Sequence, residues 1–264
     1  DALQALSVYL SSHKLVIEFT RVKTASILIG RLVSKLNNEG WFSSQMIMGV
    51  CPYIDLSNHS WDSYLATLGA AHRANVRRRL RAVSKRFQVD FEQADSESQR
   101  RHCFQSFVDL HRQRWKQRDD IDEMDVPGMW EFHAELSSTA LQLGWLRLFT
   151  LSLDGKPAAS IYAFRYNDVF YFYQSGFDPN FSKHSVGLVT MGLAIKSAIE
   201  ERAIEYDLLH GDEDYKFLWA HSGRDLMKLN CYPPTAAGLL CRQAMDLRIG
   251  IKKLMRWPRQ LLAT

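Results

Sequence analysis

The stretch that decides the fold runs from Tyr171 to Trp219 and reads YFYQSGFDPNFSKHSVGLVTMGLAIKSAIEERAIEYDLLHGDEDYKFLW. Its first seven residues predict a strand, and a polar loop follows at 178–187. An apolar run then predicts a helix from Leu188 to about Arg202, followed by a strand from Ile204 to Leu209. A polar loop that leads into a buried helix predicts an anion site, because the first backbone N–H groups are free and the helix dipole favours negative charge.

Ionisable residues gather directly after the second of these strands. They are His210, Asp212, Glu213, Asp214, Tyr215 and Lys216. Open α/β sheets bind their ligands at strand ends. The cluster and the anion site together therefore predict an active centre.

The composition of the 264 residues is that of a globular protein, with 46% apolar and 23% charged residues. A net charge of +4 is too small to indicate a nucleic-acid-binding protein by itself. The four cysteines, Cys51, Cys103, Cys231 and Cys241, show no metal-ligand spacing. They predict reduced thiols in a cytoplasmic protein that holds no metal.

No run of about 18 apolar residues predicts a transmembrane helix, and the first residues do not resemble a secretory signal. The chain begins at Asp1 without an initiator methionine and is already in a helical pattern. We therefore expect that an N-terminal portion precedes it.

The first 86 residues predict a partial domain. Helices are expected at 2–10 and 25–36, and extended segments at 15–19 and 41–56. A helical region from Trp61 to about Arg86 connects this part to the next. Such a unit has few strands with which to cover its helices.

A second domain is expected over residues 87–264. Its elements are a strand at 87–91, a helix around Phe104–Trp115, a helix at 129–143, strands at 145–153, 158–166 and 169–177, the loop, helix and strand described above, a short helix through Trp219 and a strand at 226–232. The turns Asp154-Gly155 and Asn167-Asp168 are typical of β-hairpins. The class is therefore α/β with a mixed, mostly antiparallel sheet.

Two basic helices allow two interpretations each. Residues 72–86 carry many Arg and Lys around a narrow apolar stripe, which fits a solvated linking helix or a wall for a polyanion such as a cofactor phosphate, a lipid-linked sugar phosphate or RNA. The tail at 239–262, expected to stop near Trp257-Pro258, fits a packed helix or a helix at a membrane surface.

Three stretches resemble one family when taken in this order. They are Tyr53–Leu56 with Trp61 and the helix around Arg77–Arg81, Gly144–Leu148 through Phe170–Asp178, and Tyr206-Asp207 with Gly211-Asp212 and Tyr215–Phe217. Together with the element order they resemble the GNAT acyltransferases, and within them the CelD-like, cellulose-biosynthesis branch that is itself similar to the Fem aminoacyltransferases. The resemblance covers nearly the full chain and implies two GNAT-like halves in tandem, the first of them truncated.

The resemblance implies an acyl-CoA, such as acetyl-CoA, held by the loop and by the third strand of the meander. The implied contacts are Gly176, Phe177, Ser182, Lys183, His184, Ser185, Val186 and Gly187. The loop departs from the GNAT pattern, with Ser182 at the basic position and Ser185 at the first glycine. The backbone amides from Lys183 to Leu188 remain able to cradle a pyrophosphate, and Lys183 and His184 can replace the missing charge.

Acyl transfer requires an oxyanion donor, a base where the acceptor arrives protonated, and an acid for the thiolate. The resemblance places the oxyanion donor among the amides of residues 175–177. Asp212 and His210 are candidate bases, Tyr215 is a candidate acid, and Lys216 is expected to pair with Asp212 or to bind an anionic acceptor. Gln174, Arg114 and Trp115 are candidate acceptor contacts; for each of these residues a purely structural role remains open.

Three functions follow. The first is an acyltransferase of bacterial cell-envelope or polysaccharide biosynthesis that moves an acyl group from acyl-CoA to an amine or hydroxyl of a small molecule or saccharide. The second is a Fem-type enzyme that uses aminoacyl-tRNA, and the third is a non-catalytic GNAT-like binding module. The sequence leaves the acceptor, the acyl group and the oligomeric state open.

Overall fold

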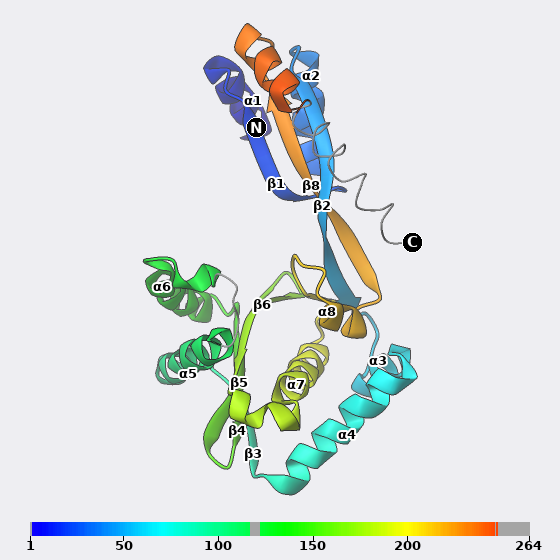
Figure 1. The fold of residues 1–264 in the computed structure, drawn as a ribbon, viewed down its shortest axis with the longest axis vertical. Helices are drawn as coiled ribbons and strands as arrows, with labels where there is room; N and C mark the ends of the chain where they lie inside the picture. The colour runs from blue at the N-terminus through cyan, green and yellow to red at the C-terminus, as the bar shows by residue number, and fades with distance from the viewer. Residues whose placement is uncertain (1, 117–121, 246, 248–264) are drawn as a thin grey trace, which may run out of the picture. The chain divides into compact units, whose positions relative to one another are not determined.

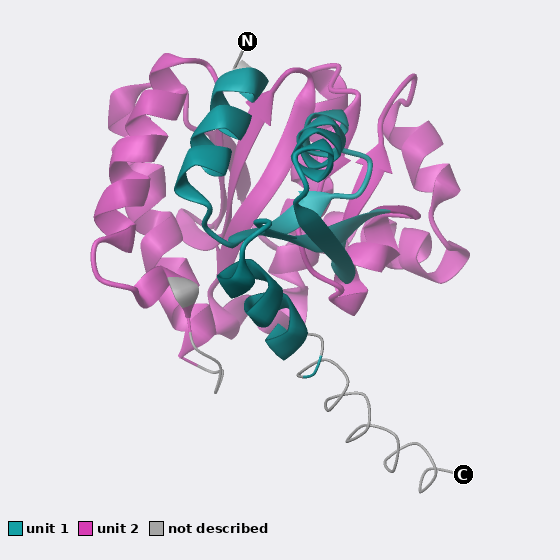
Figure 2. Ribbon diagram, turned by 90° about the horizontal axis from the view of Figure 1, so that it is seen from above, with its two compact units in different colours: residues 1–50, 224–264 teal, residues 51–223 magenta. Residues whose placement is uncertain are grey.

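A computed structural model describes residues 2–116, 122–245 and 247. The chain divides into two compact units, unit 1 with residues 1–50 and 224–264 and unit 2 with residues 51–223 (Figure 2). The predicted boundary at residue 86 concerns tandem GNAT-like halves and stays a prediction. The tail expected to end near Trp257-Pro258 lies mostly outside the described residues, which show helix at 236–245.

Unit 1 packs two helices on a short antiparallel sheet. Its elements are α1 (Ala2–His13), β1 (Ile17–Lys23), α2 (Ile27–Asn38), the first part of β2 (Phe42–Asp55) and most of β8 (Ser222–Tyr232). β1 pairs with β8 from Ile17↔Cys231 to Lys23↔Leu226. Leu32 and Leu36 of α2 and Leu229 of β8 form its core with Trp41. The strand expected at 226–232 in the second domain thus belongs to unit 1 as part of β8.

Unit 2 carries helices on both faces of a larger sheet (Figure 1). Its helices are α3 (Trp61–Thr67), α4 (Ala70–Arg86), α5 (Glu97–Trp115), α6 (Met129–Gln142), α7 (Val186–Glu200) and α8 (Asp214–Trp219), with 3-10 helices η1 (Glu123–Asp125) and η2 (Pro179–His184). Its strands are the end of β2, β3 (Val89–Gln93), β4 (Leu146–Leu153), β5 (Lys156–Tyr166), β6 (Val169–Phe177) and β7 (Glu205–Asp207). α5 and α6 lie on one face of the sheet, and α7 lies on the other with α4 beyond it.

Hydrogen bonding places the eight strands of the described residues in the order β1-β8-β2-β7-β6-β5-β4-β3. β6 and β7 are parallel, whereas β3–β4, β4–β5, β5–β6 and β2–β7 are antiparallel. The predicted mixed, mostly antiparallel α/β class is therefore confirmed. Both predicted hairpin turns have the expected left-handed backbone, with φ of 50° and 75° at Asp154-Gly155 and 47° and 60° at Asn167-Asp168.

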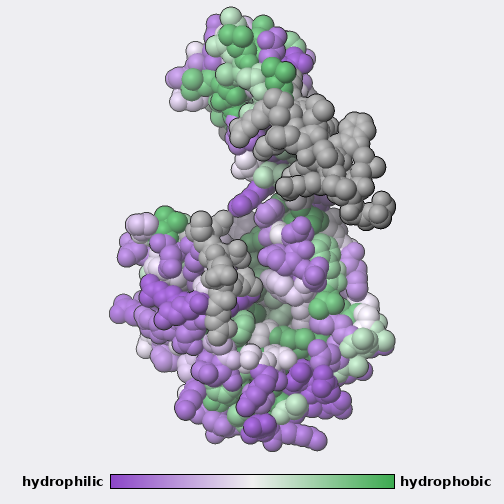
Figure 3. Space-filling model, in the orientation of Figure 1, coloured by the Kyte–Doolittle hydropathy of each residue, from purple (hydrophilic) through white to green (hydrophobic). Residues whose placement is uncertain are grey.

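The helical region expected from Trp61 to about Arg86 is two helices, α3 and α4, because the backbone is extended at Leu68 between them. On α4, Val76 and Val83 are buried, and the helix packs against α7 and η2. Arg77, Arg78, Arg81 and Arg86 of α4 are exposed, and the face of unit 2 drawn in Figure 3 is largely hydrophilic. α4 is thus a packed element of unit 2 as well as a basic surface.

α5 crosses β6 at Gly176. A Cβ atom built there would lie 2.4 Å from the backbone nitrogen of His111 and 2.6 Å from the carbonyl carbon of Leu110. These are backbone atoms in the middle of a helix, so they have no room to give way. The glycine lets the helix lie directly on the strand.

We predict that Gly176→Ala lowers the free energy of unfolding by about 1–3 kcal/mol, since the added methyl forces α5 off the sheet. The control is Gly192→Ala in α7, where the methyl would make ordinary contacts of 3.5 Å to Trp219 and 3.6 Å to Trp61. Urea denaturation should show the control unchanged or stabilised. Equal stabilities of the two variants would contradict the close approach.

Candidate acyl-transfer site

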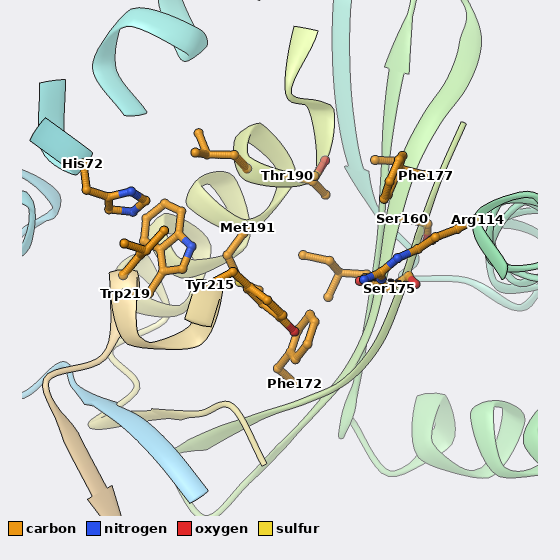
Figure 4. Close-up of a pocket in the computed structure, with 16 residues that line it drawn as sticks. His72, Arg114, Ser160, Phe172, Ser175, Phe177, Thr190, Met191, Tyr215 and Trp219 are labelled. Atoms are coloured by element: carbon orange, nitrogen blue, oxygen red, sulfur yellow. Dashed lines mark hydrogen bonds between the residues drawn. The ribbon is translucent and has the colours of Figure 1, made fainter. Parts of the chain in front are cut away.

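Unit 2 contains a pocket of ≈ 210 Å³ between α7, α8 and the end of β6 (Figure 4). Strands β5 and β6 and helices α7 and α8 supply most of its wall. The lining residues are His72, Arg114, Ala159, Ser160, Ile161, Phe172, Ser175, Gly176, Phe177, Gly187, Leu188, Thr190, Met191, Tyr215, Leu218 and Trp219. The pocket therefore joins the two regions that the sequence singles out, the loop after Phe177 and the cluster after Leu209.

The pocket lies where β6 continues beyond the end of its parallel neighbour β7. β7 pairs with β6 at residues 169–171 and ends at Asp207, whereas β6 continues along β5 to Phe177. Asp207 is almost fully buried, and its Oδ1 accepts hydrogen bonds from the Leu209 N–H at 2.8 Å and from the Cys51 thiol at 3.1 Å. These contacts hold the turn after β7, so the Asp207 carboxylate has a structural role there.

The free edge of β6 presents backbone amides to the pocket. The Asp178 N–H donates to the Ala158 carbonyl at 2.9 Å, and hydrogen-bonded pairs alternate along an antiparallel ladder. The N–H groups of Ser175 and Phe177 therefore point away from β5. That of Ser175 donates to Oε1 of the neighbouring Gln174 at 3.3 Å, a long bond that a ligand can replace.

Arg114 of α5 holds this edge of the strand. Its guanidinium donates to the Ser175 carbonyl at 3.2 Å and to the Ser175 Oγ at 2.9 Å, and it lies 5.5 Å from the centre of the Phe177 ring. Figure 4 shows it reaching the strand from the side opposite to Trp219. Arg114 thus brings a positive charge to the pocket wall.

The N-terminus of α7 opens on the same pocket. Its first helical bond joins the Val189 N–H to the Ser185 carbonyl at 3.0 Å, so the amides of Val186, Gly187 and Leu188 have no acceptor within the helix. Ser185 has a left-handed backbone, with φ 56°, and its side chain does not cap the helix. Gly187 and Leu188 line the pocket, and a Cβ atom at Gly187 would meet only the Phe177 ring, at 3.9 Å.

The expected long loop at 178–187 is mostly the 3-10 helix η2, and α7 begins at Val186 instead of Leu188. Asp178 starts η2 by accepting from the Asn180 N–H at 2.9 Å and from the Phe181 N–H at 3.0 Å. The Ser185 N–H donates to the Ser182 carbonyl at 2.9 Å. Since the loop satisfies these amides itself, the amides open to a ligand are those of residues 186–188.

Cations surround the outer side of η2. Arg79 of α4 donates to the Lys183 carbonyl at 3.0 Å, and Arg86 lies over the Phe87 ring, which also contacts His184. Partial desolvation, followed by the charges of Arg86, Lys183 and Arg79, lowers the pKa of His184. His184 is therefore neutral at pH 7, and the positive charge beside α7 comes from the arginines and Lys183.

Lys216 shapes the loop that carries the predicted catalytic cluster. Its buried ammonium donates to the His210 carbonyl at 2.8 Å and pairs with the Glu213 carboxylate at 2.9 Å. Its carboxylate partner is thus Glu213, where the sequence suggested Asp212. Gly211 has φ 136°, and a Cβ atom there would lie 2.1 Å from Glu213 Oε2 and 2.6 Å from Lys216 Nζ.

Tyr215 is the one member of the predicted catalytic group that lines the pocket among its described wall residues, and Figure 4 shows it extending toward Phe172. Asp212 and His210 are both exposed, and both lie outside that lining. Gln174 is half-buried, accepts a hydrogen bond from the Ser175 amide and is not among the described lining residues. Trp115 lies at the end of α5, where it contacts the His111 ring.

His111 is fully buried, and its Nε2 lies 3.0 Å and 3.1 Å from the two Asp122 carboxylate oxygens. This pair joins α5 to the start of η1, so His111 serves the core and not the pocket. Sequence reasoning missed the wall residues Met191, Leu218 and His72. Their types carry no chemical signal, and His72 reaches the pocket from a helix about a hundred residues upstream of α7.

His72 lies against Trp219, with 4.7 Å between the ring centroids and 88° between the ring planes. Desolvation lowers its pKa, so the imidazole is neutral at pH 7. Its buried Nε2 has no hydrogen-bond partner within the described part of the chain. This side of the pocket therefore carries no charge.

Across residues 2–116, 122–245 and 247, no cluster of three or more His, Cys, Asp or Glu side chains is arranged to hold a metal ion. None of the helices described there has the length and apolar character that crossing a membrane requires.

The sequence around this site matches a known protein family. Residues 70–217, more than half of the chain, match the acetyltransferase (GNAT) domain, so the chain belongs to that family. No curated protein matches it.

Solved structures agree on the fold. FemX is similar at a TM-score of 0.64 and 11% identity, with 86% of this chain and 76% of that chain covered. The C-terminal domain of a putative lysylphosphatidylglycerol synthetase from Agrobacterium fabrum is similar at 0.59 and 12%, covering 93% and 77%. L-PGS from Bacillus licheniformis is similar at 0.56 and 8%, covering 94% and 77%. The chain therefore has the GNAT domain that the sequence resemblance predicted and shares its fold with FemX and these synthetase domains. The CelD-like branch stays a prediction.

The ion pair of Lys216 predicts a pH dependence. Desolvation is the largest single influence on Glu213 and opposes its ionisation. The hydrogen bond from Lys216, a backbone hydrogen bond and the charges of Lys216 and His210 together outweigh it, so the pKa of Glu213 lies below its ordinary value of 4.5. A lowered folded pKa gives stability that is present above the ordinary value and is lost as the pH falls through the folded pKa. We expect Glu213→Gln to cost about 1 kcal/mol at pH 7, because the carboxylate is half-exposed and screened.

Denaturation curves should therefore separate the wild type and Glu213→Gln at pH 7 and bring them together at the acid end. Exposed Glu131 on α6 provides the control, and Glu131→Gln should follow the wild type at both pH values. A difference between wild type and Glu213→Gln that persists unchanged into acid would contradict the ion pair.

Proposed function

We propose that this chain is an acyl-CoA-dependent N- or O-acyltransferase that acts on a polysaccharide or cell-envelope precursor. One observation carries the proposal: the free amides of α7 and the free edge of β6 line the same pocket as Tyr215. Membership of the GNAT family supports acyl transfer. The similarity to FemX and to lysylphosphatidylglycerol synthetase domains supports an acceptor of the cell envelope.

The donor's phosphates are proposed to bind at the N-terminus of α7. The amides of Val186, Gly187 and Leu188 point out of the helix with its positive dipole end behind them. Lys183 and Arg79 add positive charge on the η2 side. These groups do the work of the glycine-rich GNAT loop, even though Ser185 stands at its first glycine.

The donor's acyl group is proposed to lie along the free edge of β6. The Ser175 and Phe177 amides face that edge and are placed to donate to the carbonyl oxygen as it becomes negative. The Ser175 amide gives up its long bond to Gln174 when the acyl oxygen arrives.

In the transfer, the acceptor's nitrogen or oxygen bonds to the acyl carbon and the carbon–sulfur bond breaks. Tyr215 is proposed to give a proton to the leaving thiolate, because its side chain extends into the pocket. The acceptor's proton leaves to a base, for which Asp212 and His210 beside Tyr215 stay the proposed candidates.

An aminoacyl-tRNA donor is the second candidate, and the exposed arginines 77, 78 and 81 of α4 favour it. The pocket counts against it. An aminoacyl group carries an ammonium, and none of the described residues that line the pocket is Asp or Glu. We therefore place the acyl-CoA donor first.

Acetyl-CoA is expected to protect the wild type against heat, because a ligand that binds the folded state raises the melting temperature. Gly187→Trp should abolish the protection by covering the α7 amides. Gly187→Ala should keep it, because the nearest atom to the added methyl is 3.9 Å away. Thermal unfolding with and without acetyl-CoA measures this.

If acetyl-CoA still protects both Gly187→Trp and Gly187→Ala, it binds at a site other than the α7 amides. No protection of the wild type, combined with salt-sensitive tRNA binding that weakens on neutralising Arg77, Arg78 and Arg81, would support the aminoacyl-tRNA donor instead.

Tyr215→Phe is expected to lower turnover by roughly 100-fold with little change in the Kd of acetyl-CoA, because only the proton to the thiolate is lost. Thiol release in the presence of amino sugars and saccharide precursors measures the rate. Asp212→Asn is the companion variant. Full activity of Tyr215→Phe together with a slow Asp212→Asn would move the essential proton transfer to the loop before α8.

A further inference from the structure

The pocket continues past the site of the proposed chemistry. Figure 4 shows Arg114 and Ser175 on one side, His72 and Trp219 on the opposite side, and Met191 and Tyr215 between them. Leu218 precedes Trp219 on α8 and also lines the pocket. We call His72, Leu218 and Trp219 the far end of the pocket.

The size of the pocket exceeds what an acetyl group fills. An apolar cavity of about 150 Å³ holds a benzene molecule, which has six carbon atoms. The pocket here has ≈ 210 Å³. An acetyl group has only two carbons. Part of the pocket therefore stays empty even when the part of the donor next to the thioester lies along β6.

The far end carries no charge, and its one polar ring is the neutral imidazole of His72. The ionisable residues of the described lining are His72, Arg114 and Tyr215. Arg114 lies at the opposite side, bonded to Ser175, and desolvation keeps His72 neutral at pH 7. Trp219 and Met191 are 3% and 5% exposed, so this wall is part of the core.

The cationic side chains on the neighbouring elements bond to other protein groups and not to the far end. Arg73 of α4 donates to the Ala66 carbonyl at 2.9 Å, and Lys216 of α8 is bonded to His210 and Glu213. Tyr64 of α3 donates its hydroxyl to the Trp219 carbonyl at 2.9 Å. A charged or strongly polar substrate group therefore finds no counter-charge there, whereas a hydrocarbon loses nothing on entering.

The pocket is continuous, larger than an acetyl group needs and uncharged at its far end. We therefore propose that the far end binds the acyl chain of the donor. The preferred donor is then a medium-chain acyl thioester of about four to eight carbons. The proposal rests on the proposed function and specifies its donor. The chain runs from the β6 edge past Met191 and Tyr215 to Trp219.

The test is calorimetric titration of the full chain with acetyl-, butanoyl-, hexanoyl- and octanoyl-CoA. Each buried methylene improves binding by up to roughly fourfold. Octanoyl-CoA is therefore expected to bind at least about tenfold more tightly than acetyl-CoA. Measurable but equal affinities for all four would overturn the medium-chain donor and leave the acyltransferase proposal standing, whereas failure of all four to bind would overturn both.

A pair of variants locates the chain. Leu218→Trp fills the far end at a half-exposed position, so it is expected to bring the ratio of the octanoyl- to the acetyl-CoA affinity close to one. Leu143→Trp, at an exposed leucine beyond α6, should keep the wild-type ratio. A ratio that both variants leave unchanged would place the chain elsewhere and overturn the proposal.

A further titration tests whether the chain bound at the far end belongs to the donor or to an apolar acceptor. Butylamine, hexylamine and octylamine are titrated into the protein in the presence of saturating CoA. No rise in affinity with alkyl length supports the donor as the source of the chain. A rise with alkyl length, with flat acyl-CoA affinities, would assign the far end to the acceptor and contradict the proposal.

Discussion

The separation of β6 from β7 beyond Tyr171 is the constraint on which the rest of the site depends. A parallel strand that stayed paired to Phe177 would consume the amides of Ser175 and Phe177 and close the pocket. β7 instead ends at Asp207, whose buried carboxylate holds the turn at Leu209. The open edge that results is a row of backbone donors with a defined direction, which is the element that acyl transfer needs for a developing oxyanion.

Two glycine contacts and one ion pair keep this opening in place. Gly176 lets α5 lie on β6, so Arg114 reaches Ser175 and fixes the edge from one side. On the other side, Lys216 ties the loop after β7 to the start of α8, and Gly211 leaves room for its pair with Glu213. Lys216, which the sequence predicted for the chemistry, thus holds the loop that precedes α8, the helix of Tyr215.

Much of the fold follows from sequence, because periodicity and turn residues act locally. The meander with its Asp154-Gly155 and Asn167-Asp168 turns, the apolar helix α7 and the short β7 lie within a few residues of their expected bounds. The sequence did not predict the 3-10 helix η2. Its first amides bond to Asp178 over a short range, and such bonds occur in polar loops as well as in 3-10 helices, so the residue types do not distinguish the two. The pocket's far end escaped because it depends on tertiary packing of α4 and α8 against α7, which no local pattern encodes.

The central claim is that the amides at the start of α7 hold the acyl carrier. Backbone-amide NMR with and without CoA tests it directly, because a phosphate shifts the resonances of the N–H groups that bind it. We predict the largest shifts at Val186, Gly187 and Leu188, with smaller ones at Ser175 and Phe177. Shifts confined to other parts of unit 2, with these amides unmoved, would contradict it.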